Sequence, residues 1–536
     1  MALKTSRRFL ALFTRPVALH APKRFSSGWA NWQSNSQTLP QSISILTPGT
    51  SKLTHRDLVS HLPILPYTPE TKNITPVILI TPSFAPWIYD SPSLLQAVIG
   101  HIFREWGKLD KDADIYSMAA VVDRLPVPLS NTSPFFRSDT QSFSPQKQRG
   151  SEGLSLLFLE RGSIIGSISG QLRSGDDFAQ EPEPNFIYEA TTSTGDISTR
   201  VRISTPVANT LFSTGQPHTL IAARWRFGGE SELPFLRSFR DLTQCTVKWP
   251  QVASTIGLSV PLRRLTGPRR VIASMGNVLR EISANDGTEN GIPASSELEI
   301  ILPKYVKDHN LQNQRLAVWA LVTPDNLSDT DQSVETTHDI LTLIARGARL
   351  HRVMGGGGGW GKRQGLLSLD PESSAIMNAK DVSMEGPIEE IMERGLGERE
   401  ADGESFFVES ADELPRSLGV MGKDSASPLP TVAKPGDLIQ FFIAPLEHTE
   451  HATDHELEKG DMRAIETRIF GIVPAADNVP PPTEKPDGII VLQNHFGVLS
   501  DKAVTFIALE QKEPTNQRQA VGTKIDVPGT RIIVGH

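Results

Sequence analysis

Short apolar runs separated by polar turns recur along most of the chain, and they predict a protein rich in strands. Residues 76–80 read Pro-Val-Ile-Leu-Ile, without a polar position, as expected for a strand that is buried on both faces. Residues 92–107 instead repeat apolar side chains every three or four positions, which predicts a helix. A second buried strand is expected over residues 115–122. Folded structure therefore begins near Thr75 with a strand, a helix and a strand.

The following segment adds further strands. Two apolar runs, at residues 154–159 and 163–168, flank a glycine-bearing turn and predict a hairpin. Residues 197–203 alternate apolar and polar side chains, as a half-buried strand does, and residues 219–227 form another strand. We therefore expect residues 71–230 to form a mixed α/β domain.

Residues 231–354 are expected to form a second α/β unit. Its strand candidates are residues 271–275 and 316–322. Residues 334–353 predict a long helix at the end of this unit, because apolar residues recur there at helical spacing. The core-facing stripe of this helix consists of Ile340, Ile344, Gly347 and Leu350.

The composition changes after residue 354. Residues 355–430 open with five consecutive glycines and then turn acidic, with thirteen acids against three bases over residues 372–413, so a Gly-rich loop and an acidic mobile segment are predicted. Residues 431–536 are expected to form a β-rich C-terminal unit. Its strand candidates are residues 437–444, 468–473, 488–492, 505–509 and 531–534. The predicted fold class is α+β, with a mixed α/β N-terminal unit, a central α/β unit and a β-rich C-terminal unit.

The first 25 residues have the pattern of a mitochondrial presequence. They hold six basic residues, and the first acid of the chain is Asp57. On a helical wheel a basic face lies opposite an apolar face, as mitochondrial import requires. The basic face carries Lys4, Arg7, Arg8 and Arg15, and the apolar face carries Phe9, Leu12 and Phe13. The sequence predicts cleavage after Phe25 and a location in the matrix. The alternative is a disordered basic tail that binds nucleic acid or lipid. Residues 26–70, rich in Ser, Thr, Gln and Pro, are expected to be a disordered linker.

Net charge and cysteine content exclude several classes of protein. The 536-residue chain carries a net charge of −8, which becomes −14 once residues 1–25 are removed. Non-specific affinity for nucleic acid comes largely from Lys and Arg on phosphates, so we expect no DNA binding, whereas a local basic patch leaves RNA open. Cys245 is the only cysteine, which excludes an intramolecular disulfide and a multi-cysteine metal site. No apolar run has the length of a spanning helix, so we expect no transmembrane segment and at most peripheral membrane contact.

The glycine run is the sharpest local motif. Gly356, Gly361 and Lys362 match the spacing G-x-x-x-x-G-K of a phosphate-binding loop, in which backbone N–H groups and a lysine hold the anion. Arg363 stands where a Ser or Thr would bind magnesium, and a helix rather than a buried strand is predicted before the loop. A nucleotide triphosphatase is therefore not expected. Anion or cofactor contact by Lys362, Arg363 and glycine amides such as that of Gly359 stays a candidate, and a flexible hinge is the simpler interpretation.

Four arginines around a Gly-Pro turn form a second candidate site. Arg263, Arg264, Arg269 and Arg270 would make a compact basic patch that holds RNA phosphates or an acidic partner. The alternative is a solvated turn whose arginines pair with acids of this same chain, for which the acidic stretch at residues 372–413 is the obvious source.

The remaining candidates for chemistry are weak. His448, His451 and His455 have a spacing at which imidazoles can bind zinc, but they lie in a polar segment between two predicted strands, so a solvated loop is the simpler interpretation and no metal is predicted. The chain has neither a G-x-S-x-G nucleophile elbow nor a dinucleotide-binding fingerprint. The sequence therefore names no catalytic residue and no cofactor.

The order of the predicted elements over residues 75–230 resembles the N-terminal part of FIST-type sensory domains. The likeness is carried by the strand at 77–80, the helix, the strand at Asp114-Ile115 and the apolar runs at 154–158 and 162–164. FIST-type domains are associated with small-ligand binding and signalling, so the resemblance implies a non-enzymatic ligand-binding role. Such domains often place a glycine-rich turn after the second strand, where this chain reads Ser-Met-Ala-Ala-Val-Val-Asp over residues 117–123. No binding residue is carried over.

These patterns together predict a non-catalytic protein of the mitochondrial matrix that binds other mitochondrial proteins as an accessory or assembly factor. Organelle gene expression and respiratory-complex upkeep are the settings that the compartment suggests. Two alternatives stay open. One is an enzyme or small-ligand sensor that holds a phosphorylated or anionic ligand at Gly355–Gly365. The other is an RNA-binding factor that uses Arg263–Arg270.

Overall fold

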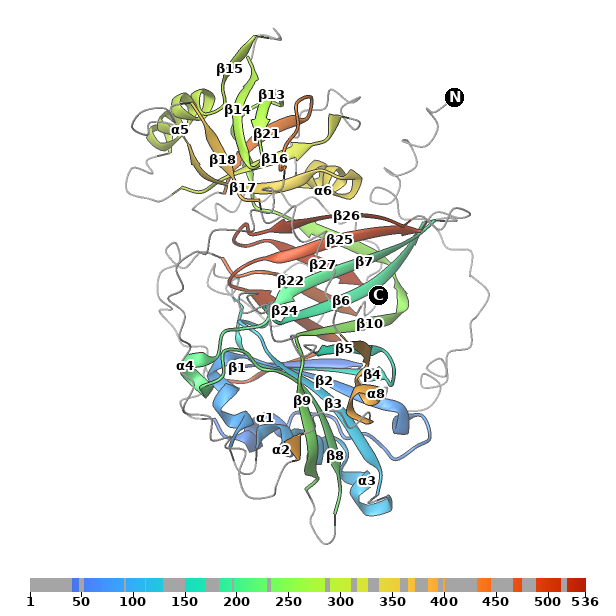
Figure 1. The fold of residues 1–536 in the computed structure, drawn as a ribbon. Coiled ribbons are helices and arrows are strands. Elements are labelled where there is room, and N and C mark those ends of the chain that lie inside the picture. The colour runs from blue at the N-terminus through green and yellow to red at the C-terminus, as the bar shows by residue number, and fades with distance from the viewer. Residues whose placement is uncertain are drawn as a thin grey trace, which may run out of the picture.

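Four β-sheets dominate the part of the chain that the computed structural model describes. The described residues are 41–47, 53–90, 93–110, 112–128, 150–168, 183–194, 197–228, 233–284, 290–309, 316–325, 337–356, 365–371, 384–393, 399–400, 431–444, 466–474, 488–511 and 518–536. Figure 1 shows a barrel at one end, a sheet covered by helices at the other, and two sheets between them. The predicted α+β class is confirmed in this coarse sense, with strands outweighing helices.

The first sheet carries the helical layer. Its eight strands are β1 (Ser42–Thr47), β2 (Ile74–Ile80), β3 (Asp114–Val121), β4 (Glu152–Glu160), β8 (Leu220–Arg226), β9 (Phe235–Asp241), β20 (Arg399–Glu400) and β23 (Ile490–Gln493). They lie in the order β20-β9-β8-β3-β2-β4-β1-β23. β2 and β3 are parallel neighbours joined through α2 (Leu94–Ile102) and α3 (Arg104–Leu109), so the predicted strand–helix–strand unit is confirmed.

The strands of this sheet are apolar on both faces because each face packs on another layer. In β2, Ile78 and Ile80 point to the helical layer, whereas Val77 and Leu79 point into the central core. The helical layer also contains α1 (His55–Val59) and the 3-10 helix η4 (Pro82–Ile88). Two shorter helices are η3 (Thr71–Asn73) and α4 (Leu211–Thr214).

Two further sheets pack on the opposite face of the first sheet. The second sheet consists of β5 (Ile164–Ile168), β6 (Asn185–Thr194), β7 (Ile197–Pro206), β10 (Gln244–Ala253), β19 (Met384–Pro387), β25 (Val504–Gln511) and β26 (Arg518–Ile525), in the order β19-β5-β10-β6-β7-β25-β26. The third consists of β11 (Thr255–Ser259), β22 (Thr467–Ile472), β24 (His495–Ser500) and β27 (Arg531–Gly535), in the order β11-β27-β22-β24. One continuous apolar cluster joins the three sheets.

The predicted hairpin at residues 154–168 is wrong. β4 pairs with β1 and β2 in the first sheet, whereas β5 pairs with β10 and β19 in the second. The turn between them, where Gly162 has a φ of 82°, therefore carries the chain from one sheet to the next. Both runs are almost fully buried, and strands buried on both faces show no alternation that would reveal their partners.

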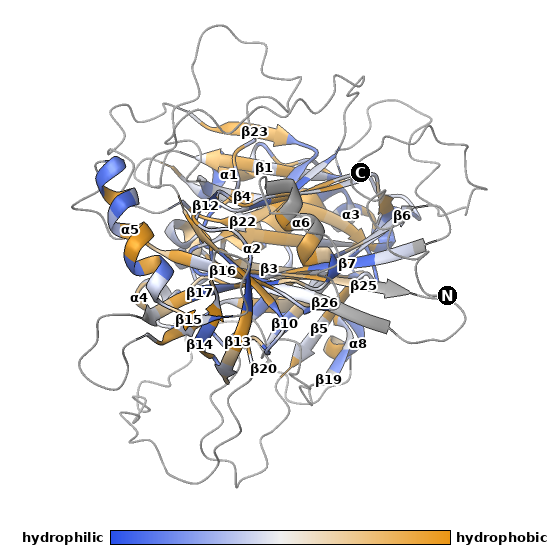
Figure 2. Ribbon diagram, turned by 90° about the horizontal axis from the view of Figure 1, so that it is seen from above, coloured by the Kyte–Doolittle hydropathy of each residue, from blue (hydrophilic) through white to orange (hydrophobic). Residues whose placement is uncertain are grey.

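The fourth sheet closes into a six-stranded antiparallel barrel. Its strands are β13 (Arg269–Met275), β14 (Val278–Ser283), β16 (Val318–Thr323), β17 (Arg349–Gly356), β18 (Leu367–Leu369) and β21 (Leu438–Ile443), and β12 (Arg263–Arg264) and β15 (Gly291–Pro293) pair at its edges. Closure follows because β21 pairs with both β13 and β16. The interior is filled by apolar side chains, and α5 (Ser296–Asp308) covers it with Leu298. Figure 2 shows both hydrophobic and hydrophilic segments along α5, and Ile300 of this helix is 73% exposed.

The long helix predicted over residues 334–353 is half as long as expected. Helix α6 (Thr337–Arg346) ends before Gly347, whose φ of 118° is a conformation that other residues rarely adopt. The chain then enters β17, and Leu350 pairs with Leu321 of β16. Leu350 is buried as predicted, but it is buried from a strand.

The sheets do not follow the predicted boundaries between consecutive units. β1 lies in the first sheet between β4 and β23, which corrects the expectation that residues 26–70 form a linker. The region predicted as an acidic mobile segment contributes β19, α8 (Ile388–Glu393) and β20. Strands of the predicted β-rich C-terminal unit enter all four sheets. No helix among the described residues is long and apolar enough to cross a membrane.

Candidate anion-binding site

Two arginines, an aspartate and a tyrosine share one face where β3 and β8 run side by side. In this antiparallel pair Asp114 is opposite Arg226, and Tyr116 is opposite Arg224. Cross-strand partners have Cβ atoms about 5 Å apart on the same face. Because side chains alternate along a strand, the Arg-Trp-Arg order of β8 places both arginines on this face and Trp225 on the helical side.

The Asp114 carboxylate holds both arginines of β8. Arg226 donates from Nε to Oδ1 and from Nη2 to Oδ2, each at 3.0 Å, and Arg224 donates from Nη2 to Oδ2 at 2.6 Å. Partial burial raises the pKa of Asp114, but the hydrogen bonds from the two arginines outweigh it and hold the pKa below its ordinary value. Asp114 is therefore ionised at neutral pH.

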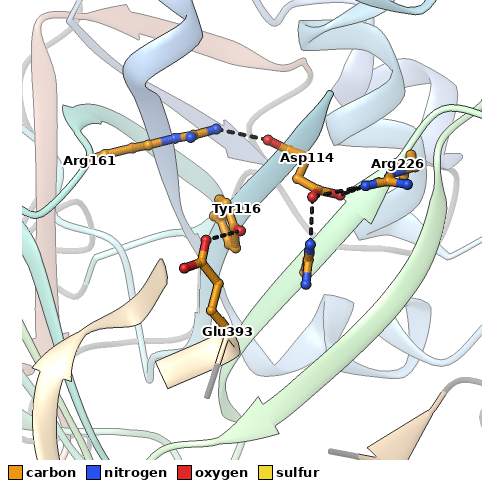
Figure 3. Close-up of polar contacts among 6 residues, drawn as sticks. Asp114, Tyr116, Arg161, Arg226 and Glu393 are labelled. Atoms are coloured by element: carbon orange, nitrogen blue, oxygen red, sulfur yellow. Dashed lines mark hydrogen bonds and ion pairs between the residues drawn. The ribbon is translucent and has the colours of Figure 1, made fainter. Parts of the chain in front are cut away.

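A third arginine approaches the same strand from the turn between β4 and β5. Nη2 of Arg161 donates to the backbone oxygen of Asp114 at 2.8 Å, and its guanidinium carbon lies 5.1 Å from the centre of the Tyr116 ring. The guanidinium carbon of Arg224 lies 5.9 Å from that centre. Figure 3 shows these side chains around Asp114 and Tyr116. Tyr116 therefore interacts with two guanidinium groups, a favourable arrangement for its π-system.

Tyr116 also binds the acidic helix α8. Its hydroxyl donates to Oε1 of Glu393 at 3.0 Å, across 277 positions of the sequence. Burial, and then this hydrogen bond to Glu393, raise the pKa of Tyr116 to about 12. The tyrosine is therefore protonated at physiological pH and acts as a donor to the carboxylate (Figure 3).

The cluster has more positive than negative charge and reaches the surface. Among the contacts of the described residues given above, three guanidinium groups face two carboxylates, those of Asp114 and Glu393. The side chains of Asp114, Arg224 and Arg226 are 19%, 23% and 27% exposed, and Arg161 is exposed. Among the described residues Arg161 has no carboxylate partner in an ion pair. Guanidinium groups bind carboxylates and phosphates through paired N–H donors, so the arrangement can hold a further anionic group.

A second polar cluster lies in the interior, where the three packed sheets meet. Arg468 is fully buried, donates to Oε2 of Glu466 at 3.0 Å and lies 4.5 Å from the centre of the Trp249 ring. His495 binds Ser44 through Nδ1 at 2.9 Å, and burial lowers the pKa of this histidine to about 3, so it stays neutral. These contacts connect β1, β10, β22 and β24. Because Arg468 and His495 are buried, their role is to join the sheets.

The four arginines of the predicted basic patch differ in exposure, and two of them, Arg269 and Arg270, pair with acids of this same chain. Arg269 is buried, and its Nη2 and Nε donate to the carboxylate of Glu297 at 2.5 Å and 3.2 Å. Arg270 is exposed and lies 3.0 Å from Asp325. Arg263 and Arg264 are exposed on β12. Glu297 and Asp325, the described partners of Arg269 and Arg270, lie outside the acidic stretch at residues 372–413, and Arg269 is closed to solvent.

The glycine run connects two barrel strands. Gly355 and Gly356 end β17, where they pair with Ser368 and Leu367 of β18. The segment is thus preceded by a strand, not by the predicted helix, and it is followed by a strand, whereas a phosphate-binding loop leads into a helix. The other candidate residues of this motif, Gly359, Gly361, Lys362 and Arg363, lie outside the described residues.

The other candidates of the sequence are either undescribed or inert. His448, His451 and His455 lie outside the described residues. Within the described ranges no group of three or more His, Cys, Asp and Glu side chains is placed to hold a metal ion. Cys245 is fully buried in the central core, and burial raises the pKa of its thiol, so it behaves as the expected small apolar residue.

Part of the signal for this group of side chains, called the arginine cluster below, is visible in the sequence. The cluster consists of Asp114, Tyr116, Arg161, Arg224, Arg226 and Glu393. Arg224 and Arg226 are two positions apart on a predicted strand and must share a face. Their partners Asp114, Arg161 and Glu393 come from distant parts of the chain, and nothing local indicates that they meet.

The cluster has to be interpreted from its own geometry. Searches of protein-family models, of curated proteins and of solved structures find no match for this chain.

Proposed function

We propose that this protein is a non-catalytic binding protein of the mitochondrial matrix, and that it acts as an accessory or assembly factor by holding an anionic group of its partner at the arginine cluster. The observation that supports the binding role is the surplus of guanidinium groups over carboxylates at a partly exposed site, with Arg161 free of a carboxylate partner among the described residues. The acid-free, amphipathic first 25 residues support the compartment. Organelle gene expression and respiratory-complex upkeep are the processes in which we would seek the partner.

An anion titration tests the binding role. The purified full-length protein is heated with increasing pyrophosphate or citrate, and the melting temperature is compared with that in sulfate at equal ionic strength, because salts also stabilise proteins non-specifically. A ligand at 100 times its Kd adds about 2.7 kcal/mol to the free energy of unfolding. We expect a saturable increase in the wild type and its loss in Arg161→Gln, whose exposed side chain can change without affecting the core.

Arg104→Gln is the matched control. Arg104 is 52% exposed on α3, and its ion-pair partner among the described residues is Glu105 of the same helix. This variant removes the same charge and should keep the full response. An equal response in wild type and Arg161→Gln, or no response at all, would overturn the proposed binding role.

The compartment is tested separately. Residues 1–25 fused to a fluorescent protein should direct it to mitochondria, and the N-terminal sequence of the native protein should begin at Ser26. A cytosolic fusion would refute the matrix location and leave the anion-binding role to the titration above.

A further inference from the structure

Residues 384–393 contact the rest of the protein through a strand and a helix, and each of these is a known way of binding a peptide. β19 adds an antiparallel strand to the edge of β5, with Glu385 opposite Ser167 and Gly386 opposite Gly166. Helix α8 follows directly after Pro387 and lies on the inner face of the first sheet. Strand addition gives affinity through main-chain hydrogen bonds, and a helix in a groove adds side-chain specificity.

The apolar side chains of α8 pack closely against the protein surface beneath them. Ile388, Ile391 and Met392 are buried, with at most 1% exposure. Gly166 makes space for them, since a Cβ there would lie 3.1 Å from Cδ1 of Ile391 and 3.2 Å from Cγ2 of Ile388. Burial of three such side chains provides the apolar part of the docking energy.

The acidic side of α8 meets donors on the same sheet. Oε1 of Glu389 accepts from Oγ1 of Thr75 at 2.9 Å, and Oε1 of Glu393 accepts from the hydroxyl of Tyr116 at 3.0 Å. Residues four positions apart share a helix face, so both carboxylates approach the sheet together. The arginine that interacts with Tyr116 from the turn, Arg161, adds positive charge beside them.

These contacts define the chemistry of an occupant. It has a short strand, a proline, apolar residues at the first, fourth and fifth positions of a helix, and acids at the second and sixth. All contacts named above are made by residues 384–393 alone. A separate peptide of this pattern can therefore make the same contacts without a covalent connection.

We propose that the surface beneath residues 384–393 is a peptide-binding groove, and that the partner of the protein presents an acidic amphipathic segment of this pattern, which takes the place of α8. The inference rests on the proposed function, because the partner's acid that takes the place of Glu393 would bind Tyr116 within the arginine cluster. The internal segment competes as a tethered ligand, at an effective concentration of about millimolar. A partner therefore displaces the internal segment only if it has a higher affinity for the groove or a high local concentration.

Peptide binding to the full-length chain tests the groove. The probe is a fluorescein-labelled peptide of residues 383–395, and anisotropy reports its binding. In Ile391→Asp the internal helix loses its apolar contact, so we expect the peptide to bind at least tenfold more tightly to this variant than to the wild type. A peptide with Glu389→Gln and Glu393→Gln should bind at least tenfold more weakly than the unmodified peptide. A peptide with Glu385→Gln should bind unchanged, since Glu385 is exposed and pairs only through its backbone.

Two safeguards keep the test decisive. If Ile391→Asp does not fold, the double variant Glu389→Ala and Glu393→Ala in the full chain replaces it, because it keeps the apolar contacts. A folded variant that binds no peptide, or that binds the acidic and the neutralised peptides equally, overturns the groove.

A pyrophosphate titration on the same samples distinguishes failure of the peptide-binding groove from failure of the proposed anion-binding function. If pyrophosphate acts through Arg161 while the peptide does not bind, the groove fails and the anion site stands. If the peptide binds with the expected acid dependence while pyrophosphate has no effect, the groove stands and the small-anion site fails.

Discussion

Replacing Asp114 by Asn should destabilise the protein far more than an ordinary surface ion-pair change does. The Asp114 carboxylate accepts three hydrogen bonds from two arginines that are about three-quarters buried. A hydrogen bond to a charged group contributes about 1.5–3 kcal/mol, and an Asn oxygen keeps part of this network. Breaking a fully buried ion pair costs about 3–5 kcal/mol, and partial exposure reduces that cost. We therefore expect a loss of about 2–3 kcal/mol in the free energy of unfolding at pH 7.

Urea unfolding followed by tryptophan fluorescence measures this loss. Trp225 is buried between the two arginine positions, donates from Nε1 to Oγ of Ser117 at 2.8 Å, and contributes to the emission of the eight tryptophans, which follows global unfolding. The control is Asp325→Asn, which makes the same substitution in an ion pair whose side chains are 54% and 59% exposed. Such surface pairs contribute about 0–1 kcal/mol. A loss in Asp114→Asn no larger than in this control would refute the assigned role of the carboxylate.

The pH dependence gives an independent check. The folded pKa of Asp114 is lowered, because the arginine hydrogen bonds outweigh its burial. Unfolded Asp titrates near pH 3.9, so the carboxylate adds stability above that pH and loses it as the pH falls through the folded pKa. The difference between wild type and Asp114→Asn should be full at pH 7 and shrink below about pH 4. Pyrophosphate should stabilise the variant more than the wild type, because Arg226 has lost the carboxylate that it binds. A difference that is independent of pH would contradict the mechanism.

Three further predictions follow from the described contacts. Arg269→Gln leaves the carboxylate of Glu297, which is 12% exposed, without its partner and should cost about 3 kcal/mol. Arg270→Gln should cost less than about 1 kcal/mol, as urea midpoints would show. Gly497→Ala places a Cβ 1.9 Å from a backbone oxygen of β22 and should abolish soluble expression, which a gel of the soluble fraction checks. Burial lowers the pKa of His351 to about 4, below the unfolded value of about 6.5, so its contribution to stability is lost as the pH falls between those values. His351→Asn should flatten the pH profile of the urea midpoint in that window.

Strand positions were accessible from sequence because apolar runs of five to eight residues are a direct consequence of burial on both faces. The predicted strand at 76–80 lies within β2, and that at 115–122 overlaps β3 over seven residues. The pairing partners of the strands could not be predicted, because an apolar run in which polar and apolar residues do not alternate does not indicate the register of the strand or the sheet to which it belongs. The misplaced hairpin at β4 and β5 shows this, as does β1, which pairs with β23 some 450 residues later and was expected to be part of a linker.

The end of α6 and the docking of α8 also could not be predicted from local sequence patterns. Apolar spacing over residues 334–353 fits a helix, yet the backbone at Gly347 ends α6, and the apolar positions beyond it are buried in a strand. The acidic composition of residues 372–413 predicts a mobile segment, yet apolar residues at 388, 391 and 392 dock part of it on the core. The average composition of about forty residues does not reveal that three apolar side chains within them are buried against the core.

Edge protection explains why a small anion alone is not expected to replace α8. β19 covers the edge of β5 in the second sheet, and β20 covers the edge of β9 in the first. Exposed strand edges pair readily with other chains, so release of residues 384–393 would expose the edge of β5 to aggregation. Pyrophosphate can neutralise Arg161, but it supplies neither the main-chain hydrogen bonds nor the three apolar side chains that the groove accommodates. A partner that displaces the segment must itself present a strand followed by an acidic amphipathic helix. The groove therefore favours a protein segment over a small anion, and the arginine cluster favours a segment that carries acids.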